Sequence, residues 1–220
     1  MPPALVIFDL DGTLIDSAPD LAVAINAMLA GYGSQPLPVG EVRRMVGDGV
    51  AMLVARALAA SDCRPADPAA AERSFMRHYE SAATSLTTVF PGAAQALQAL
   101  SAARIPLAVC TNKPARIATD ILDNLGLGKY FARVLGGDSL PFRKPDPRVL
   151  LALLEEFTAA ATDALLVGDS EVDAATAHAA GVPFVLMKHG YRRGPVAEIP
   201  CRAALENFAE LPALLDVSPR

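Results

Sequence analysis

Two aspartates, Asp9 and Asp11, directly follow a short apolar run at residues 5–8. A continuous apolar run of this length is typical of a strand covered on both faces, and Gly12 permits a tight turn just beyond it. In open parallel sheets, ligands bind outside the carboxyl ends of the strands. Two carboxylates held together are costly unless a cation or a proton compensates their charge. The pattern therefore indicates either a metal site or a nucleophile beside an acid.

Two further apolar runs, at residues 105–110 and 164–167, also end in side chains that can bind or react. The first is followed by hydroxyl, amide and ammonium groups, and the second by two more acids. A lysine between these runs precedes a turn that is bracketed by prolines. The residues concerned are Thr111, Asn112, Lys113, Lys144, Asp169 and Asp173.

These four segments together resemble the motifs of the haloacid dehalogenase superfamily of phosphotransferases. The resemblance rests on Asp9-x-Asp11-x-Thr13, Thr111, Lys144 and Gly168-Asp169-Ser170-x-x-Asp173 as its first to fourth motifs. They occur in the family's order and at ordinary spacings over nearly the whole chain. Each motif alone is a weak signal, but D-x-D-G-T after an apolar run is fairly specific and the set of four is a strong one.

The catalytic residues that follow from this resemblance are Asp9, Asp11 and Lys144. Asp9 is the candidate nucleophile, since an aspartate can attack phosphorus and form an acyl phosphate. Asp11 is the candidate general acid and base for the leaving oxygen and for the attacking water. Lys144 places a positive charge against the phosphoryl oxygens and Asp9. The alternative for Asp9 is a strand-end acid that caps a turn, and the alternative for Lys144 is a solvated surface lysine.

The same carboxylates predict a Mg²⁺ site, because this ion prefers a few hard oxygen ligands completed by water and substrate phosphate. The metal set is Asp9, Asp169, the backbone carbonyl of Asp11 by family analogy, and Asp173. Asp173 acts either through a coordinated water or by orienting Lys144, and the alternative is a first-turn acid that faces a helix dipole. Mn²⁺ and Co²⁺ suit the same oxygen ligands.

The substrate-binding residues are expected in two places. Gly12, Thr111, Asn112 and Lys113 lie at strand ends, where a hydroxyl and free backbone N–H groups form a phosphate cradle. The loop Gly47-Asp48-Gly49 permits close backbone approach to a ligand, and in the family a loop at this place reads the leaving group. For this loop a plain helix connection is the alternative, and Lys113 is as well explained by a surface position. We interpret residues 189–194 as a solvated turn, with the rim of the site as the alternative.

The expected fold is α/β, a doubly wound parallel-sheet (Rossmann-like) core with an inserted α-helical cap domain. Residues 1–15 and 87–220 form the core and residues 16–86 the cap. The first cap helix begins at a capping Ser17 and ends at Gly31. The other cap helices are expected at 39–46, 51–60 and 70–83. The core is expected to alternate helices at 92–103, 115–124, 147–157 and 171–180 with strands at 105–110, 131–136, 164–168 and 182–187.

Composition excludes several other classes of protein. The 220 residues include 19 Lys and Arg against 24 Asp and Glu, a net charge of −5 with no basic stripe, which argues against nucleic-acid binding. No signal peptide or bilayer-spanning apolar run is expected. The three scattered cysteines indicate neither a disulfide framework nor a zinc site. We expect a cytoplasmic monomer or homodimer whose partner is a small-molecule phosphoester.

Within this superfamily the chain most resembles the phosphoglycolate phosphatases, and that resemblance rests on four further segments: Asp16-Ser17-Ala18-Pro19-Asp20-Leu21, Thr111-Asn112-Lys113-Pro114, Lys129-Tyr130-Phe131 and Gly136-Gly137-Asp138. Asp11 argues against dehalogenation, since a halide leaving group needs no proton, and the absence of lysine before Lys113 argues against relatives that use a cap lysine to cleave carbon–phosphorus bonds. The expected function is Mg²⁺-dependent hydrolysis of a small anionic phosphometabolite, 2-phosphoglycolate first. The alternatives are a sugar-phosphate mutase, a phosphatase for pyrophosphate, nucleoside monophosphates or amino-sugar phosphates, and a catalytically idle binding protein.

Overall fold

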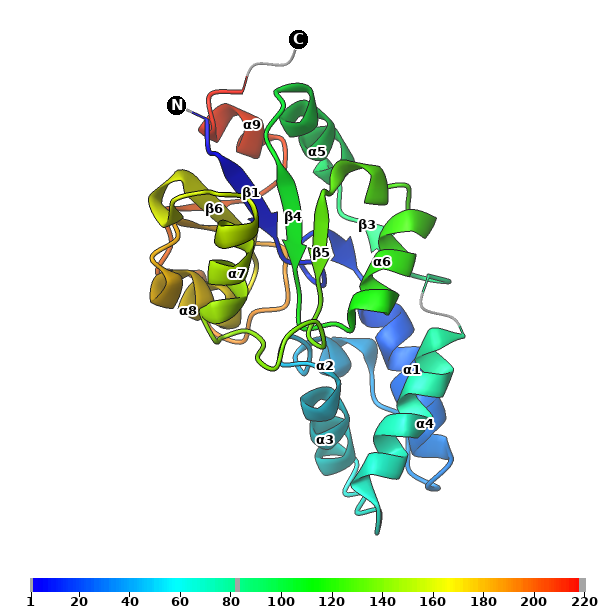
Figure 1. Ribbon diagram of the computed structural model, residues 1–220. Coiled ribbons are helices and arrows are strands. Elements are labelled where there is room, and N and C mark those ends of the chain that lie inside the picture. The colour runs from blue at the N-terminus through cyan, green and yellow to red at the C-terminus, as the bar shows by residue number, and fades with distance from the viewer. Residues whose placement is uncertain (1, 82–83, 218–220) are drawn as a thin grey trace.

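A six-stranded parallel sheet forms the centre of the molecule (Figure 1). The computed structural model describes residues 2–81 and 84–217. The strands lie in the order β5-β4-β1-β6-β7-β8, so β1 is central and the chain turns to opposite sides of it. Ligands bind at such a switch point, outside the carboxyl ends of the strands. The strands are β1 Leu5–Phe8, β4 Leu107–Cys110, β5 Arg133–Leu135, β6 Ala164–Gly168, β7 Phe184–Met187 and β8 Ala203–Leu205.

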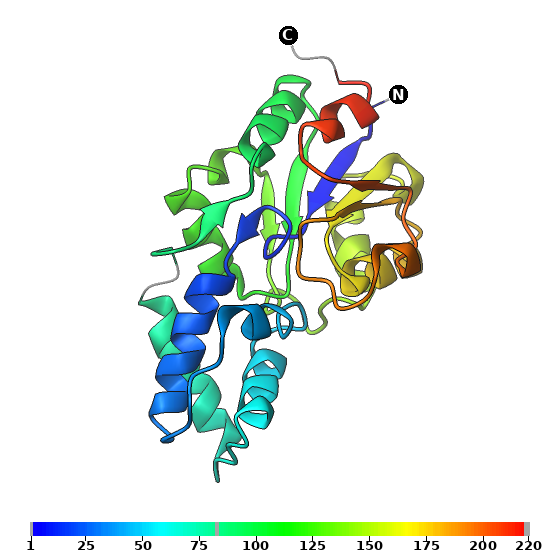
Figure 2. The same cartoon turned by 180° about the vertical axis from the view of Figure 1, so that it is seen from behind.

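Helices cover both faces of the sheet because successive strand residues point to opposite sides. Val6 and Phe8 of β1 face one apolar cluster with α5, α6 and α9, whereas Leu5 and Ile7 face a second cluster with α7 and α8. Figures 1 and 2 show these two helical layers from opposite sides. The fold class is therefore confirmed. The helices are α5 Ala93–Ala102, α6 Ala115–Asn124, α7 Arg148–Glu156, α8 Glu171–Ala180 and α9 Glu210–Leu214.

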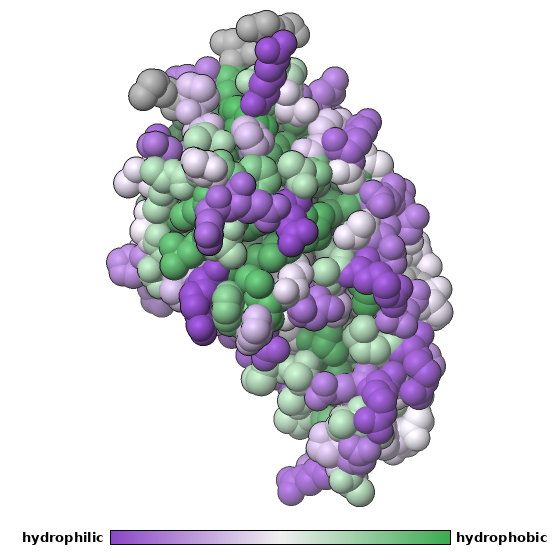
Figure 3. Space-filling view, in the orientation of Figure 1, coloured by the Kyte–Doolittle hydropathy of each residue, from purple (hydrophilic) through white to green (hydrophobic). Residues whose placement is uncertain are grey.

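Four helices inserted after the first sheet strand lie beyond the carboxyl ends of the strands (Figure 1). They pack around buried apolar side chains such as Ile25, Met28 and Phe75. Hydrophilic side chains cover the outer faces of α4 and the neighbouring α6 (Figure 3), where Arg73 and Arg116 are exposed. The division into a core and a cap at residues 16–86 stays a prediction. These helices are α1 Ala18–Ala30, α2 Val39–Arg43, α3 Val50–Ala60 and α4 Pro68–Glu80.

Several local predictions need correction. Two short antiparallel strands, β2 Ile15–Asp16 and β3 Thr88–Val89, join the helical group to the sheet and were not expected. The sequence patterns also missed β8 and α9, and α2 ends before the predicted residue 46. The predicted fourth helix extended to residues 82–83, which lie outside the described part of the chain. Within the described ranges, no helix has the length and apolar character needed to cross a bilayer.

Ser17 stands at the N-terminus of α1, but its hydroxyl forms no capping bond to the helix backbone. The prediction of a capping serine is therefore wrong. The hydroxyl instead donates to Oδ1 of Asp11 at 2.5 Å. The reason is the turn after β1, which brings Asp11 within reach of the start of α1.

Candidate active site

Asp9 and Lys144 form a buried ion pair at the carboxyl end of β1. The Asp9 backbone is fixed by its N–H donating to the Val167 carbonyl of β6. The Lys144 ammonium lies 2.8 Å from Oδ1 of Asp9 and 2.6 Å from Oδ1 of Asp173, and its side chain is only 2% exposed. One cation thus bridges two carboxylates that come from opposite ends of the sequence. Burial opposes the charge of Lys144, but the two carboxylates raise its pKa overall.

Three carboxylates meet beside this lysine. Ligand oxygens of Asp9, Asp169 and Asp173 all lie within 4.8 Å of one another, and all three residues are buried. Burial raises the pKa of Asp9 to about 7, although Lys144 opposes the shift. Burial and the neighbouring charges of Asp173 and Asp9 raise the pKa of Asp169 well above its usual range. Such a cluster is stabilised by protons or by a cation.

Asp173 is already held by hydrogen bonds on both carboxylate oxygens. Its Oδ2 accepts from the Ser170 hydroxyl at 2.7 Å and from the backbone N–H groups of Ser170 and Asp169 at 3.2 Å, while Oδ1 faces Lys144. Ser170 and Asp173 form a capping box at the start of α8. Asp173 thus contacts Lys144 and also lies in the first turn of α8. Its part in metal binding stays a prediction.

Asp169 is fixed from two sides. Thr13 donates its hydroxyl to Oδ1 at 2.8 Å, and the Tyr191 backbone N–H donates to Oδ2 at 2.6 Å. Gly12 lies against it, because a Cβ there would stand 2.4 Å from Oδ2. Gly12 has a φ of +84°, which glycine adopts without strain. The residue therefore allows the turn after β1 to approach Asp169 closely.

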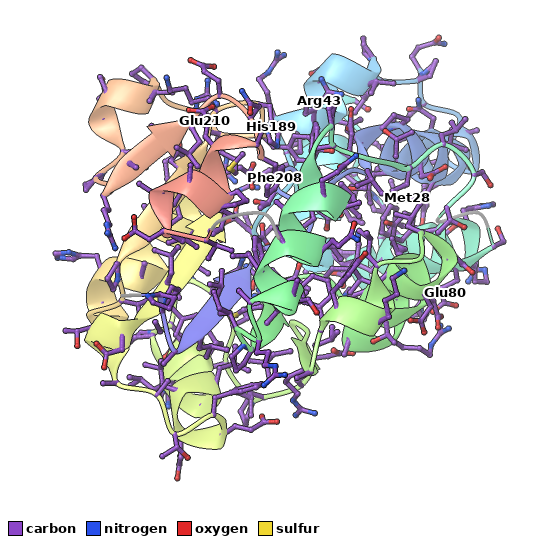
Figure 4. All side chains as sticks on the ribbon, turned by 90° about the horizontal axis from the view of Figure 1, so that it is seen from above. Met28, Arg43, Glu80, His189, Phe208 and Glu210 are labelled. Atoms are coloured by element: carbon purple, nitrogen blue, oxygen red, sulfur yellow. The ribbon has the colours of Figure 1, made fainter. Side chains whose placement is uncertain are left out.

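The interpretation of residues 189–194 as a solvated turn is wrong, because Tyr191 in this segment is buried. Tyr191 is 5% exposed, and its hydroxyl donates to Oδ1 of Asp16 at 2.6 Å. The nearby His189 and Phe208 are labelled in Figure 4, and their ring centroids are 5.7 Å apart. The centroid of the His189 ring also lies 4.0 Å from that of the Phe90 ring, and the His189 Nε2 lies 3.1 Å from the Thr13 carbonyl. This segment braces the turn that carries Asp11 to Thr13. The sequence of residues 189–194 has neither the helical nor the strand periodicity that could have indicated this role.

Asp11 connects the strand end to the inserted helices. Its Oδ2 lies 2.9 Å from the Lys113 ammonium, and its Oδ1 accepts from Ser17. Lys113 also donates to the Tyr79 hydroxyl of α4 at 2.7 Å. Lys113 is 6% exposed, so the alternative of a surface lysine is excluded by its burial.

Thr111 and Asn112 follow β4, as the sequence predicts. The Asn112 amide donates to the Gly47 carbonyl and to the Lys144 carbonyl, both at 2.9 Å. This side chain therefore joins the inserted loop to the segment that carries Lys144. The Thr111 hydroxyl accepts from the Lys113 backbone N–H at 3.2 Å.

The loop at residues 47–49 reaches the site through its glycines. Gly47 and Gly49 line the pocket, whereas the Asp48 carboxylate is bound by Arg193 and by Arg56 at 2.5 Å. Burial disfavours the ionised Asp48 carboxylate, but the two guanidinium groups outweigh this effect and lower its pKa overall. The Asp48 side chain thus links the inserted helices to the core rather than lining the pocket.

A pocket between the carboxyl ends of the strands and the inserted helices contains part of this site. Gly12, Asp48, Lys144, Asp169 and Asp173 are not among its lining residues. Its core side carries the charged and polar residues, and its helical side is mostly apolar. Sequence reasoning missed the residues on this side of the pocket. Val46 lies in the turn between α2 and α3, and the helical spacing of the others is equally typical of a core face. These residues are Leu21, Val46, Val50, Leu53, Phe75 and Tyr79. The pocket is lined by Asp9, Asp11, Leu21, Val46, Gly47, Gly49, Val50, Leu53, Phe75, Tyr79, Thr111, Asn112, Lys113 and Pro114.

Comparison with known proteins identifies the family. The family model of the haloacid dehalogenase-like hydrolases matches residues 6–187. The chain belongs to this family. Within the haloacid dehalogenase-like hydrolases, it is similar to a phosphoglycolate phosphatase from Cereibacter sphaeroides, with 46% identity over 212 residues that cover 96% of each chain. It is also 47% identical to a phosphoglycolate phosphatase from Rhodospirillum rubrum, over 95% of this chain and 89% of the relative.

Solved structures of the family support the same assignment. The crystal structure of a predicted phosphoglycolate phosphatase from Haemophilus somnus superposes with a TM-score of 0.93. It is 32% identical and the match covers 96% of this chain and 97% of that one. The predictions of the family and of a phosphoglycolate phosphatase-like enzyme are confirmed.

Proposed function

We propose that this hydrolase is a Mg²⁺-dependent phosphomonoesterase that cleaves 2-phosphoglycolate through an aspartyl phosphate on Asp9. The observation that carries the proposal is the Asp9 carboxylate, held by Lys144 at 2.8 Å within a cluster of buried acids. The names of the similar proteins support the choice of substrate. A cytoplasmic location and a monomeric or homodimeric state stay predictions.

In the first half of the reaction, a carboxylate oxygen of Asp9 attacks phosphorus. The bond from phosphorus to the ester oxygen breaks, and the leaving oxygen takes a proton from Asp11. Lys144 offsets negative charge on the transferring phosphoryl group. Thr111 and the backbone after β4 hold the phosphoryl oxygens.

In the second half, water attacks the phosphorus of the aspartyl phosphate and gives a proton to Asp11. The acyl phosphate bond breaks, which releases inorganic phosphate and restores the Asp9 carboxylate. Closure of the Gly47–Gly49 loop over the pocket excludes bulk water from these steps. Asn112 holds that loop through the Gly47 carbonyl.

The acidic cluster fits a divalent cation. Asp9, Asp169 and Asp173 form the cluster and Asp11 lies beside it. Among the described residues, the ammonium groups that pair with these four carboxylates are those of Lys113 and Lys144. Asp9, Asp169 and the Asp11 carbonyl would hold Mg²⁺, with Asp173 acting beside them. When bound, the ion neutralises charge on the phosphoryl oxygens.

The decisive experiment is phosphate release from a panel of phosphometabolites with Mg²⁺ and with a chelator. We expect a metal-dependent preference for 2-phosphoglycolate over pyrophosphate, nucleoside monophosphates, amino-sugar phosphates and glucose 1-phosphate. Chelation should reduce the rate by about 10³-fold or more, since phosphoryl transfer depends on charge stabilisation. Weak activity with many of these compounds would agree with the proposed mechanism but would contradict the proposed preference for 2-phosphoglycolate. If the phosphoryl group of a labelled substrate were retained in a sugar bisphosphate rather than released as phosphate, the protein would be a mutase instead.

We expect Mg²⁺ to stabilise the protein more at pH 8 than at pH 5.5. The folded-state pKa of Asp9 is raised from 3.8 to about 7, so the folded protein binds more protons than the unfolded chain between these values and loses stability as pH rises. Protons also compete with the metal for the carboxylates. A tenfold gain in Mg²⁺ affinity corresponds to a melting temperature roughly 3–6 °C higher. Thermal unfolding with and without Mg²⁺ at both pH values measures this, and an equal shift at both would contradict it.

A further inference from the structure

Lys113 is a buried cation that the phosphoryl-transfer steps leave without a role. It is 6% exposed and lines the pocket between Asp11 of the core and Tyr79 of α4. Its ammonium lies 2.9 Å from Asp11 Oδ2 and 2.7 Å from the Tyr79 hydroxyl. Burying a lysine is costly even when a carboxylate pairs with it, because both charges lose their hydration, so its place in the pocket requires an explanation.

The donors around Lys113 exceed the acceptors that the described residues supply. An ammonium group has three N–H donors, and Asp11 and Tyr79 accept two of them. The Tyr79 hydroxyl accepts from Lys113 and, among the described residues, donates its own proton to no acceptor. Burial raises the pKa of Tyr79 to about 12, so the phenol keeps this proton at neutral pH. One ammonium N–H and one phenol O–H therefore stand side by side at the pocket.

Tyr79 is held rigidly in this position. It is 2% exposed and stacks on Phe75, with ring centroids 5.5 Å apart. The Lys113 ammonium also lies 4.8 Å from the centre of the Tyr79 ring. The rest of the helical wall is apolar, formed by side chains such as Leu21, Val50 and Leu53. A polar leaving group thus meets one fixed pair of donors on an otherwise apolar wall.

We propose that Lys113 and Tyr79 bind the carboxylate of the leaving group, so that the enzyme selects phosphoesters of short hydroxy acids. This inference rests on the proposed function and assigns a specificity role to Tyr79. Each carboxylate oxygen would accept one hydrogen bond, from the free N–H of Lys113 and from the Tyr79 hydroxyl.

The position of Asp11 limits the length of the hydroxy acid. Asp11 serves the leaving oxygen and lies 2.9 Å from the Lys113 ammonium, so the leaving oxygen and the carboxylate must be close together. One carbon atom separates them in 2-phosphoglycolate. A bound carboxylate also competes with Asp11 for Lys113, and this competition releases Asp11 towards the leaving oxygen.

The test compares 2-phosphoglycolate with 2-hydroxyethyl phosphate, in which a hydroxymethyl group replaces the carboxylate. The quantity measured is the ratio of kcat/KM for the two substrates. Tyr79→Phe should lower this ratio by about 10- to 100-fold, the size expected for one hydrogen bond to a charged group. Tyr32→Phe is the matched control, since it makes the same change at an exposed position near the end of α1 and should leave the ratio unchanged.

The outcomes separate this inference from the proposed function. A wild-type ratio near one, with both esters hydrolysed, would overturn the carboxylate role while the phosphatase stands. No hydrolysis of any phosphoester would overturn the proposed function itself. An unchanged ratio in Tyr79→Phe would also overturn the inference, provided that circular dichroism shows a native fold. Competitive inhibition by glycolate that weakens in Tyr79→Phe, with ethylene glycol as the neutral control, measures the same contact without catalysis.

Discussion

Asp9→Asn is expected to reduce kcat by about 10⁴-fold or more, as the loss of a catalytic nucleophile does in other hydrolases. The amide cannot attack phosphorus, so no acyl phosphate forms. The fold should survive, because burial disfavours the Asp9 carboxylate and a neutral amide removes that cost. Lys144 keeps its contact with Asp173 at 2.6 Å. Steady-state phosphate release and thermal unfolding without Mg²⁺ are the measurements.

The control for Asp9→Asn is Asp120→Asn, the same change at an exposed position of α6. This variant should keep both activity and the stabilisation by Mg²⁺. Asp9→Asn should lose the Mg²⁺ stabilisation along with turnover. Residual activity within tenfold of the unchanged enzyme would refute a covalent mechanism through this residue.

The parts of the fold that the sequence predicts are those with strong local signals. The apolar run of β6 and the amphipathic pattern of α6 correspond to the predicted residues 164–168 and 115–124. Short edge elements gave no such signal. β8 is three residues long with only one buried, and α9 is a five-residue helix that contains Pro212.

The sequence predicted more of the residues on the core side of the candidate site than on the side formed by the inserted helices. Asp9, Thr111 and Asp169 follow parallel strands whose register brings their ends to one edge. The partners of these residues depend on how distant segments pack. Tyr79 on α4 contacts Lys113, and Tyr191 after β7 contacts Asp16. No local sequence pattern relates either tyrosine to its partner.

The roles of Ser17 and Asp48 show why a motif alone was insufficient. Each was predicted from its immediate neighbours, Ser17 as a helix cap and Asp48 as a residue of a glycine loop. In the structure, Ser17 donates to Asp11 and Asp48 binds Arg56 and Arg193. A side chain with several possible partners takes the one that tertiary packing offers, and that choice is not encoded locally.

Asp11→Asn is expected to lower kcat for 2-phosphoglycolate by roughly 10²- to 10⁴-fold, the usual contribution of a general acid or base. The amide can neither protonate the leaving oxygen nor activate the attacking water. Ser17→Ala should lower kcat less than Asp11→Asn does, since it removes only the hydroxyl that donates to Asp11 at 2.5 Å. Rapid-quench measurement of the aspartyl phosphate separates its formation from its breakdown.

The leaving group distinguishes acid catalysis by Asp11 from a purely structural role. p-Nitrophenolate leaves readily without a proton. Asp11→Asn should therefore slow formation of the aspartyl phosphate less with p-nitrophenyl phosphate than with 2-phosphoglycolate, and the two effects should differ by at least tenfold. Breakdown should be slowed equally with both substrates, because water attacks the same intermediate. An equal loss in the formation step for both esters would instead mean that Asp11 acts by holding Lys113, its ion-pair partner at 2.9 Å.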